Sequence, residues 1–171
     1  MLPVWYILVY TMFIYKLVDA LLENELEYAI VGGWAVALQG AVRGTVDIDI
    51  VIRVEKKSFL KAQAVLSALG LSPVLPVDAS QVFDFREEYI KNRNLIAWSF
   101  VNPAKPSEIV DIIITHDLKK MKVVKLKADG HVFNVLALDD LILMKKQSGR
   151  PQDLEDVIAL EEIKNKGKAK K

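Results

Sequence analysis

The fold is decided by the sequence Val31-Gly32-Gly33-Trp34-Ala35-Val36, followed by Arg43-Gly44-Thr45-Val46-Asp47-Ile48-Asp49-Ile50. A Gly-Gly turn follows one apolar run, and the next apolar run carries two aspartates separated by one isoleucine. Because side chains alternate between the faces of a strand, Asp47 and Asp49 point to the same face. Two carboxylates on one face repel each other unless a cation lies between them. Such oxygen ligands suit Mg²⁺ or Mn²⁺, so the pattern indicates metal-dependent phosphate chemistry.

The composition is typical of one globular domain. The chain has 171 residues, 52% of them apolar, and a net charge of +1, so we expect residues 1–171 to form a single domain with its own core. Cysteine is absent, which excludes disulfides, thiolate metal sites and cysteine nucleophiles. With only two histidines, His116 and His131, a histidine-based metal cluster is not expected. We expect a cytoplasmic protein.

The first fifteen residues carry no charged side chain. This run is shorter than the about 20 apolar residues that a membrane-spanning helix needs. It also lacks the basic region and the cleavage site of a signal peptide. We interpret residues 1–15 as an apolar helix that is buried or forms a homo-oligomer contact, and we expect no membrane partner.

Hydrophobic periodicity predicts helices mixed with strands, and hence an α/β (α+β) protein with a mixed sheet flanked by helices. Helices are expected at residues 16–24, 34–40, 55–69, 138–147 and 151–164. Strands are expected at residues 28–31, 46–54, 71–75, 81–87, 95–101, 108–115, 123–127 and 131–135. The last two strands would form a hairpin at Asp129-Gly130, a favourable two-residue turn. Within the domain, residues 16–115 would hold the metal site, 116–164 the C-terminal hairpin and helices, and 165–171 a mobile lysine-rich tail.

A third carboxylate, Asp111, lies in the middle of the β-branched run 108–115. Buried carboxylates are rare unless they are paired or bound to a metal. If this strand neighbours the strand of Asp47 and Asp49, three carboxylates converge, and with a triphosphate they can hold two Mg²⁺ ions. Asp111 would then also be placed to help deprotonate a nucleophile. The alternative is an exposed carboxylate on an edge strand.

Gly32 and Gly33 suit contact with phosphate. Glycine lets backbone N–H groups approach an anion closely, and the start of a helix adds a partial positive charge. The alternative is a plain strand-to-helix turn. Arg43 and Thr45 offer a guanidinium and a hydroxyl just before the first aspartate, although Arg43 also suits a salt bridge to either aspartate.

The ordered set of Gly32-Gly33, the segment Arg43 to Asp49, and Val110-Asp111-Ile112 resembles the DNA polymerase β-like nucleotidyltransferase superfamily. The pattern of that superfamily is a Gly-Gly or Gly-Ser turn, a helix, an Asp-x-Asp strand and a later single aspartate on a strand. Within it, the chain looks most like the small AbiEii-type, toxin-like nucleotidyltransferase group. The segments 138–145 and 149–156 add to that likeness.

The resemblance implies the minimal nucleotidyltransferase fold and transfer of a nucleoside monophosphate from an NTP to a hydroxyl acceptor, with release of pyrophosphate. The metal-binding and catalytic residues would be Asp47, Asp49 and Asp111, with Mg²⁺ or Mn²⁺ as cofactor. The nucleotide-binding residues would be Gly32, Gly33, Arg43, Thr45 and Lys145. The acceptor would be RNA, a protein hydroxyl or a small molecule. The alternatives are a non-catalytic module that binds a nucleotide or a partner protein, and a tRNA-modifying toxin paired with an antitoxin.

Other charged residues near the C-terminus have less specific interpretations. Lys145, Lys146 and Arg150 lie on or beside a predicted helix, where a solvated face is the alternative to contact with phosphate. Asp153 and Asp156 are interpreted as residues that favour the start of the last helix. The lysine-rich run 118–127 suits either an RNA backbone or a solvated hairpin edge protected from aggregation.

Overall fold

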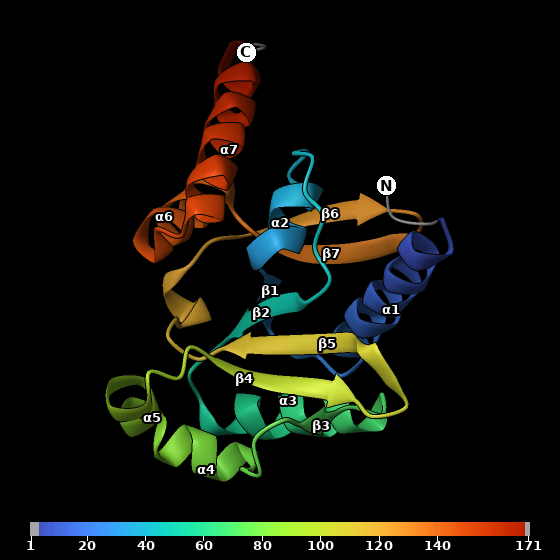
Figure 1. Cartoon of the computed structure of the whole chain (residues 1–171), viewed down its shortest axis with the longest axis vertical. Helices are drawn as coiled ribbons and strands as arrows, with labels where there is room; N and C mark the ends of the chain where they lie inside the picture. Colours follow the sequence, from blue (N-terminus) through green and yellow to red (C-terminus); the bar gives the residue numbers. More distant parts are fainter. Residues whose placement is uncertain (1–3, 170–171) are drawn as a thin grey trace.

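A single seven-stranded mixed sheet forms the centre of the molecule, with the strand order β3-β4-β5-β2-β1-β7-β6 (Figure 1). The computed structural model describes the backbone of residues 4–169 and the side chains of residues 12–167. The strands are β1 (Tyr28–Ile30), β2 (Ile48–Ile52), β3 (Ser72–Pro73), β4 (Ala97–Asn102), β5 (Lys105–Ile113), β6 (Val123–Ala128) and β7 (His131–Leu136). The predicted mixed sheet flanked by helices is therefore confirmed.

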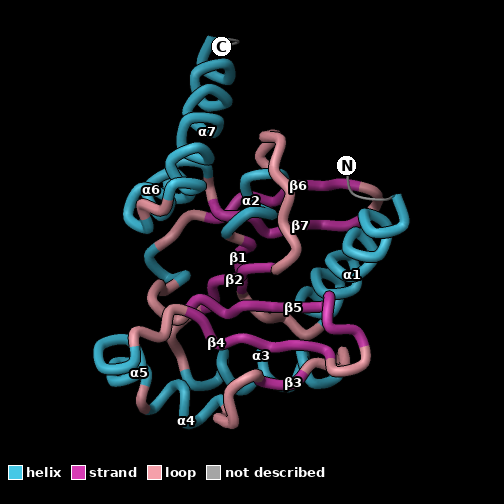
Figure 2. The backbone as a smooth tube through the Cα atoms, in the orientation of Figure 1, coloured by secondary structure: helices cyan, strands magenta, loops and turns pink. Residues whose placement is uncertain are grey.

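Helices lie on both faces of the sheet and at its ends (Figure 2). They are α1 (Val4–Glu23), α2 (Gly32–Leu38), α3 (Lys56–Ala68), α4 (Ala79–Asp84), α5 (Arg86–Arg93), the 3₁₀ turn η1 (Leu118–Lys120), α6 (Leu138–Ser148) and α7 (Pro151–Ala169). On one face, Phe59 of α3 stacks on Trp98 of β4 with ring centroids 6.2 Å apart. On the other face, α2 begins directly against β2. The strands β4 and β5 are not covered by a helix on the face that Figure 1 presents.

The apolar N-terminal segment is part of one longer helix. Whereas the sequence predicts a helix at residues 1–15 and a second at 16–24, α1 runs without a break from Val4 to Glu23. Its inward residues from Phe13 to Leu21 are buried in the core. The side chains of residues 1–11, on which the predicted homo-oligomer contact depends, lie outside the described residues. None of the described helices has the length and apolar character needed to cross a membrane.

Residues 79–93 form two helices, so the predicted strand at 81–87 is wrong. The start of α4 has a capping box: the Asp78 carboxylate accepts from the Gln81 backbone N–H at 2.9 Å, and the Gln81 side chain accepts from the Asp78 N–H at 2.9 Å. The helix α5 ends at Asn94, which has a left-handed φ of 50°. The polar segment before β4 therefore ends a helix.

The C-terminal hairpin is confirmed: β6 and β7 pair antiparallel around Asp129-Gly130. The strand β6 lies at the edge of the sheet and its lysines are exposed. This position favours the interpretation of a solvated, protected edge. The helix α7 continues to Ala169 and is thus longer than the predicted segment 151–164.

Candidate functional site

Asp49 and Asp111 lie side by side on neighbouring parallel strands. The register of β2 against β5 pairs Asp49 with Asp111 directly. The apolar residues before and after each aspartate are buried in the core. Because side chains alternate along a strand, both carboxylates face the opposite side of the sheet. The structure thus brings these two predicted residues together on one face.

Asp47 lies just before β2, because the strand begins at Ile48 and not at residue 46 as the sequence predicts. Its side chain is more exposed than that of Asp49. Partial burial, together with the negative charge of Asp111, raises the pKa of Asp47. Asp47 therefore lies within electrostatic reach of the pair without being aligned with it.

The environment of the pair disfavours two negative charges. Burial, and after it the negative charges of Asp111 and Asp47, raise the pKa of Asp49 to about 7 against the opposing positive charges of Lys145 and Arg150. The Oδ1 atom of Asp111 is buried and has no hydrogen-bond partner. Buried polar atoms almost always have one, so this atom points to a ligand.

A divalent cation fits this donor set in part. Within residues 12–167, no group of three or more Asp, Glu or His side chains is arranged as a ready-made metal site. Mg²⁺ is, however, commonly bound by one or two carboxylates together with phosphate oxygens of a substrate. Asp49 and the unpartnered oxygen of Asp111 would supply the two carboxylates of such a site.

The raised pKa of Asp49 predicts a pH-dependent stability. Because the pKa of Asp49 in the folded chain, about 7, exceeds that of an unfolded aspartate, the contribution of Asp49 to stability is complete below about pH 4 and is lost as the pH rises through about 7. Asp49→Asn removes the charge and should raise the melting temperature near neutral pH by about 5 °C. Mg²⁺ should stabilise only the wild type, since it binds the folded site. Melting curves from pH 4 to 8 test this, and identical pH profiles of the two proteins would contradict it.

The Gly-Gly turn packs directly on Asp49 and Thr45. Gly32 has a φ of +62°, and a Cβ there would lie 1.8 Å from Oδ2 of Asp49. A Cβ on Gly33 would lie 2.7 Å from Oγ1 of Thr45. The Val31 N–H also donates to the Asp49 carbonyl at 2.9 Å. Glycine is therefore needed twice to bring a carboxylate and a hydroxyl against the start of α2.

A pair of alanine substitutions can separate this contact from backbone strain. Gly32→Ala combines the left-handed φ with the collision with Asp49, so we expect it to lower the free energy of unfolding by more than about 2 kcal/mol. Gly130→Ala is the matched control, because Gly130 has a φ of +81° and no neighbouring atom within 4 Å. It should show only the backbone effect. Urea unfolding that gave the same free energy for both variants would contradict the contact between Gly32 and Asp49.

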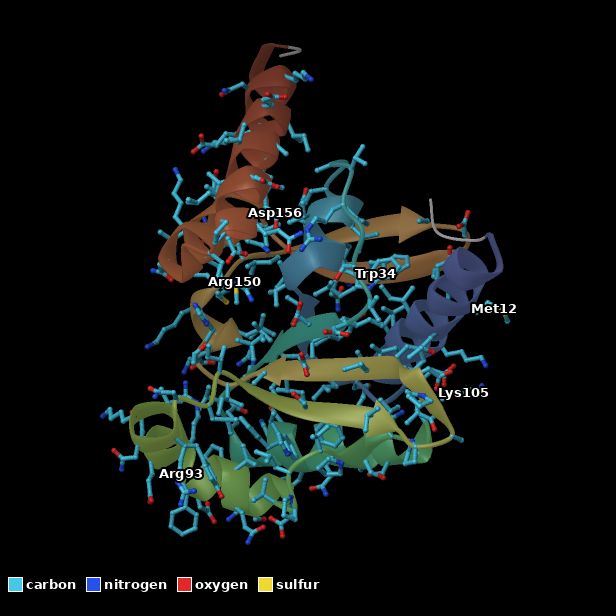
Figure 3. The ribbon with its side chains drawn as sticks, viewed as in Figure 1. Met12, Trp34, Arg93, Lys105, Arg150 and Asp156 are labelled. Carbon is cyan, nitrogen blue, oxygen red and sulfur yellow. The ribbon has the colours of Figure 1, made fainter. Side chains whose placement is uncertain are left out.

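A buried cluster of charged residues lies where α6, α7 and the loop before β2 meet (Figure 3). The Lys145 Nζ atom lies 2.9 Å from Asp153 Oδ1 and 2.8 Å from Asp156 Oδ2. The Arg150 Nε atom donates to Asp153 at 2.7 Å, and the Arg43 Nε atom lies 3.1 Å from Asp156 Oδ1. Lys145, Asp153 and Asp156 are each at most 5% exposed. Burial alone would raise the pKa of Asp153, but hydrogen bonds from Arg150, Lys145 and Ser148 outweigh it and hold the pKa well below its usual range.

This cluster corrects three interpretations. Arg43 pairs with Asp156 and not with an aspartate of the Asp-x-Asp segment. Asp153 lies in the first turn of α7, as expected, but Asp153 and Asp156 are both buried and form ion pairs with Lys145. Lys145 is held between two carboxylates, whereas 75% of the Arg150 side chain is exposed.

Comparison with known proteins identifies a family that matches almost the whole chain. The model of a family described as "Nucleotidyltransferase of unknown function (DUF6036)" matches residues 12–166. A search of curated proteins finds no match to the sequence.

Three solved structures share the fold. The lincosamide antibiotic adenylyltransferase LnuA, bound to lincomycin, has a TM-score of 0.58 at 15% identity, covering 89% of this chain and 96% of that chain. An antigenic nucleotidyltransferase-like protein from Paracoccidioides brasiliensis has a TM-score of 0.55 at 18% identity, with coverages of 86% and 73%. ANT(2″)-Ia in complex with adenylyl-2″-tobramycin has a TM-score of 0.55 at 15% identity, with coverages of 90% and 91%.

Proposed function

The chain belongs to this family of nucleotidyltransferases, and from that premise we propose that it transfers a nucleoside monophosphate from an NTP to a hydroxyl acceptor with the help of Mg²⁺ or Mn²⁺. One observation carries the proposal: Asp49 is aligned with Asp111 on the neighbouring strand, and Asp49 lies against a turn that requires glycine. A paired, partly buried set of carboxylates beside a close backbone turn suits a triphosphate with its cation.

The triphosphate would lie over the Gly32-Gly33 turn, where backbone N–H groups can approach it closely. The positive charges of Lys145 and Arg150 act on Asp49 and would attract the phosphates to the same place. Lys145 is enclosed by its two carboxylates, whereas the side chain of Arg150 is largely exposed. Of these two cations, Arg150 is therefore the one that would contact the phosphates directly. Thr45 adds a hydroxyl beside the turn.

The residues have distinct tasks in the transfer. Asp49 and Asp111, with Asp47 nearby, would hold a divalent cation, which when bound polarises the α-phosphate and neutralises the leaving pyrophosphate. Asp111 would accept the proton of the acceptor hydroxyl. The hydroxyl oxygen then forms a bond to the α-phosphorus, the bond between that phosphorus and the bridging oxygen breaks, and pyrophosphate leaves with the electron pair.

The first acceptors to test are small molecules that carry a hydroxyl group. Two of the structures with the same fold are antibiotic adenylyltransferases by their descriptions, one bound to lincomycin and one to an adenylylated tobramycin. RNA and protein hydroxyls remain the other predicted acceptors. The narrower resemblance to the AbiEii-type group also stays a prediction, together with the tRNA-modifying toxin and its antitoxin, as does the non-catalytic binding module.

Transfer of a labelled nucleotide tests the proposal. The full chain is incubated with each α-³²P-labelled NTP, with Mg²⁺ or Mn²⁺, and with lincosamides, aminoglycosides, total RNA or cell protein. We expect label on one acceptor class and stoichiometric pyrophosphate. Nucleotide binding without label on any acceptor, with both metals and at several pH values, would instead support the non-catalytic module.

A further inference from the structure

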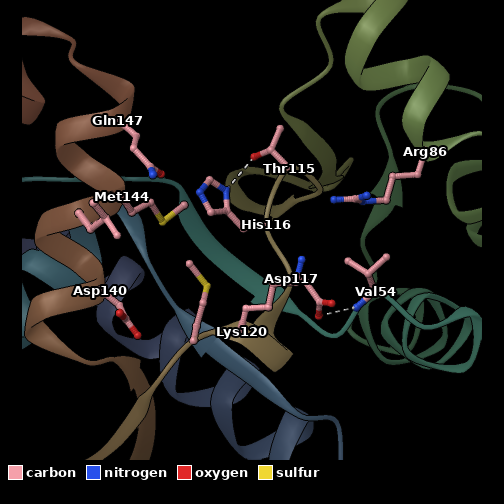
Figure 4. Close-up of a pocket in the computed structure, with 11 residues that line it drawn as sticks. Val54, Arg86, Thr115, His116, Asp117, Lys120, Asp140, Met144 and Gln147 are labelled. Atoms are coloured by element: carbon pink, nitrogen blue, oxygen red, sulfur yellow. Dashed lines mark hydrogen bonds between the residues drawn. The ribbon is translucent and has the colours of Figure 1, made fainter.

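A cleft of about 320 Å³ lies beyond the carboxylate pair, between α6, α5 and the loop that follows β5 (Figure 4). Its walls include Thr115 and His116 from the loop and Met144 and Gln147 from α6. Its volume is within the range of small-molecule sites, which begins at about 300 Å³.

The cleft lies within reach of a nucleotide bound at Asp49 and Asp111. The strand β5 ends at Ile113, two residues after Asp111, and Thr115 lies in the turn that follows it. Four residues of extended chain span at most about 14 Å, so the Cα atoms of Asp111 and Thr115 are no farther apart than that. The helix α6 connects the two places as well, because Lys145, near Asp49, follows Met144 directly in the sequence.

The charges on the walls favour a neutral ligand. Two cations, Arg86 and Lys120, are matched by two carboxylates, Asp117 and Asp140. Three of these four side chains form hydrogen bonds with the backbone. Arg86 Nε donates to the Ile114 carbonyl oxygen at 2.6 Å. The Asp117 and Asp140 carboxylates accept from the N–H groups of Val54 at 3.1 Å and Lys122 at 2.6 Å. A second phosphate site would need an excess of positive charge, which this cleft lacks.

The remaining groups suit a flat heterocycle. The Gln147 side chain is exposed and offers both a donor and an acceptor. Met144 adds a polarisable thioether, which packs well on rings. The His116 ring is fixed by a contact of 2.9 Å between its Nδ1 atom and Thr115 Oγ1. In Figure 4 the side chains of Gln147 and Met144 point toward this ring.

We propose that this cleft binds the nucleobase of the donor nucleotide and that Gln147 reads the hydrogen-bonding edge of the base. The inference rests on the proposed function, because it places the base of the same NTP whose phosphates lie at Asp49. It assigns the choice among ATP, GTP, CTP and UTP to residues of α6 and of the loop after β5.

Binding measurements on the full chain with Mg²⁺ test the inference. The probes are the four NTPs and inorganic tripolyphosphate, which has no base. Gln147→Ala should weaken the preferred NTP about tenfold, the effect of one lost hydrogen bond to a ligand. Gln147→Glu, which replaces a donor by an acceptor, should change the order of preference. Both variants should bind tripolyphosphate like the wild type. Gln152→Ala, an exposed glutamine of α7, is the matched control and should change nothing.

Three results would overturn the inference. NTP binding with the same order of preference in all variants would show that the base lies elsewhere. Unchanged NTP binding with weaker binding of an acceptor in the Gln147 variants would make the cleft an acceptor site. Failure of the wild type to bind any of the five probes would overturn the proposed function as well, so the two failures are distinguishable.

Discussion

Asp49→Ala should abolish label transfer, with a loss of at least about a thousandfold, and leave a folded protein. Asp49 is the residue that lies in register with Asp111 and against the Gly32 turn. On the proposed mechanism, its removal would take away a metal ligand and with it the neutralisation of charge that develops on the leaving pyrophosphate. The loss should appear with both Mg²⁺ and Mn²⁺ in single-turnover assays of labelled NTP.

A matched aspartate controls for unspecific effects of this substitution. Asp84 also forms an ion pair, with Lys56 at 2.8 Å, but it is 46% exposed and lies on α4. Asp84→Ala should therefore keep the transfer rate of the wild type. Transfer by Asp49→Ala at more than a tenth of the wild-type rate would remove Asp49 from the metal site.

Asp153→Ala should lower the free energy of unfolding by about 3 to 5 kcal/mol, the usual effect of leaving one partner of a buried ion pair unpaired. The substitution takes away one carboxylate beside Lys145 and the hydrogen-bond acceptor of Arg150. Because the pKa of Asp153 is held below its usual range, the stability that it contributes is present above about pH 4 and is lost as the pH falls further. Urea unfolding at pH 7 gives the value.

An exposed ion pair on the same two helices provides the comparison. Lys146 and Glu161 lie 2.6 Å apart, but their side chains are 52% and 46% exposed. Glu161→Ala should change the free energy of unfolding by less than about 1 kcal/mol. Equal effects of the two substitutions would mean that the cluster around Lys145 does not hold α7 in place.

Local patterns were sufficient to predict the strands that carry the aspartates. In the Asp-x-Asp segment each aspartate alternates with an isoleucine, and Asp111 lies between valine and isoleucine; such alternation fixes a face before any tertiary contact is known. Reasoning from local patterns fails at residues 81–87, where Val82, Phe83 and Phe85 suggest a strand. The signal that decides there is Asp78 with Gln81 three residues later, a capping box that starts a helix.

The charged cluster could not be read from the sequence, because its partners are distant. Arg43 and Asp156 are separated by most of the sequence. No motif near either residue identifies the other as its partner. Asp153 and Asp156 resemble ordinary acidic residues at a helix start. Their burial follows only from the way α7 packs on α6 and on the loop before β2, which is a tertiary property.

The register of β2 against β5 also determines when the site can exist. Parallel strands cannot pair until the chain between them has folded back, and here α3, β3, α4, α5 and β4 all lie between them. Closing such a long loop has an entropic cost that is recovered only once the strands are in contact, which delays this step of folding. Asp49 and Asp111 therefore meet late, and a ribosome-bound chain that stops before β5 has no paired carboxylates. Asp49 and Asp111 would be paired only once β5 has joined the sheet. Incomplete chains should therefore be unable to bind the proposed divalent cation.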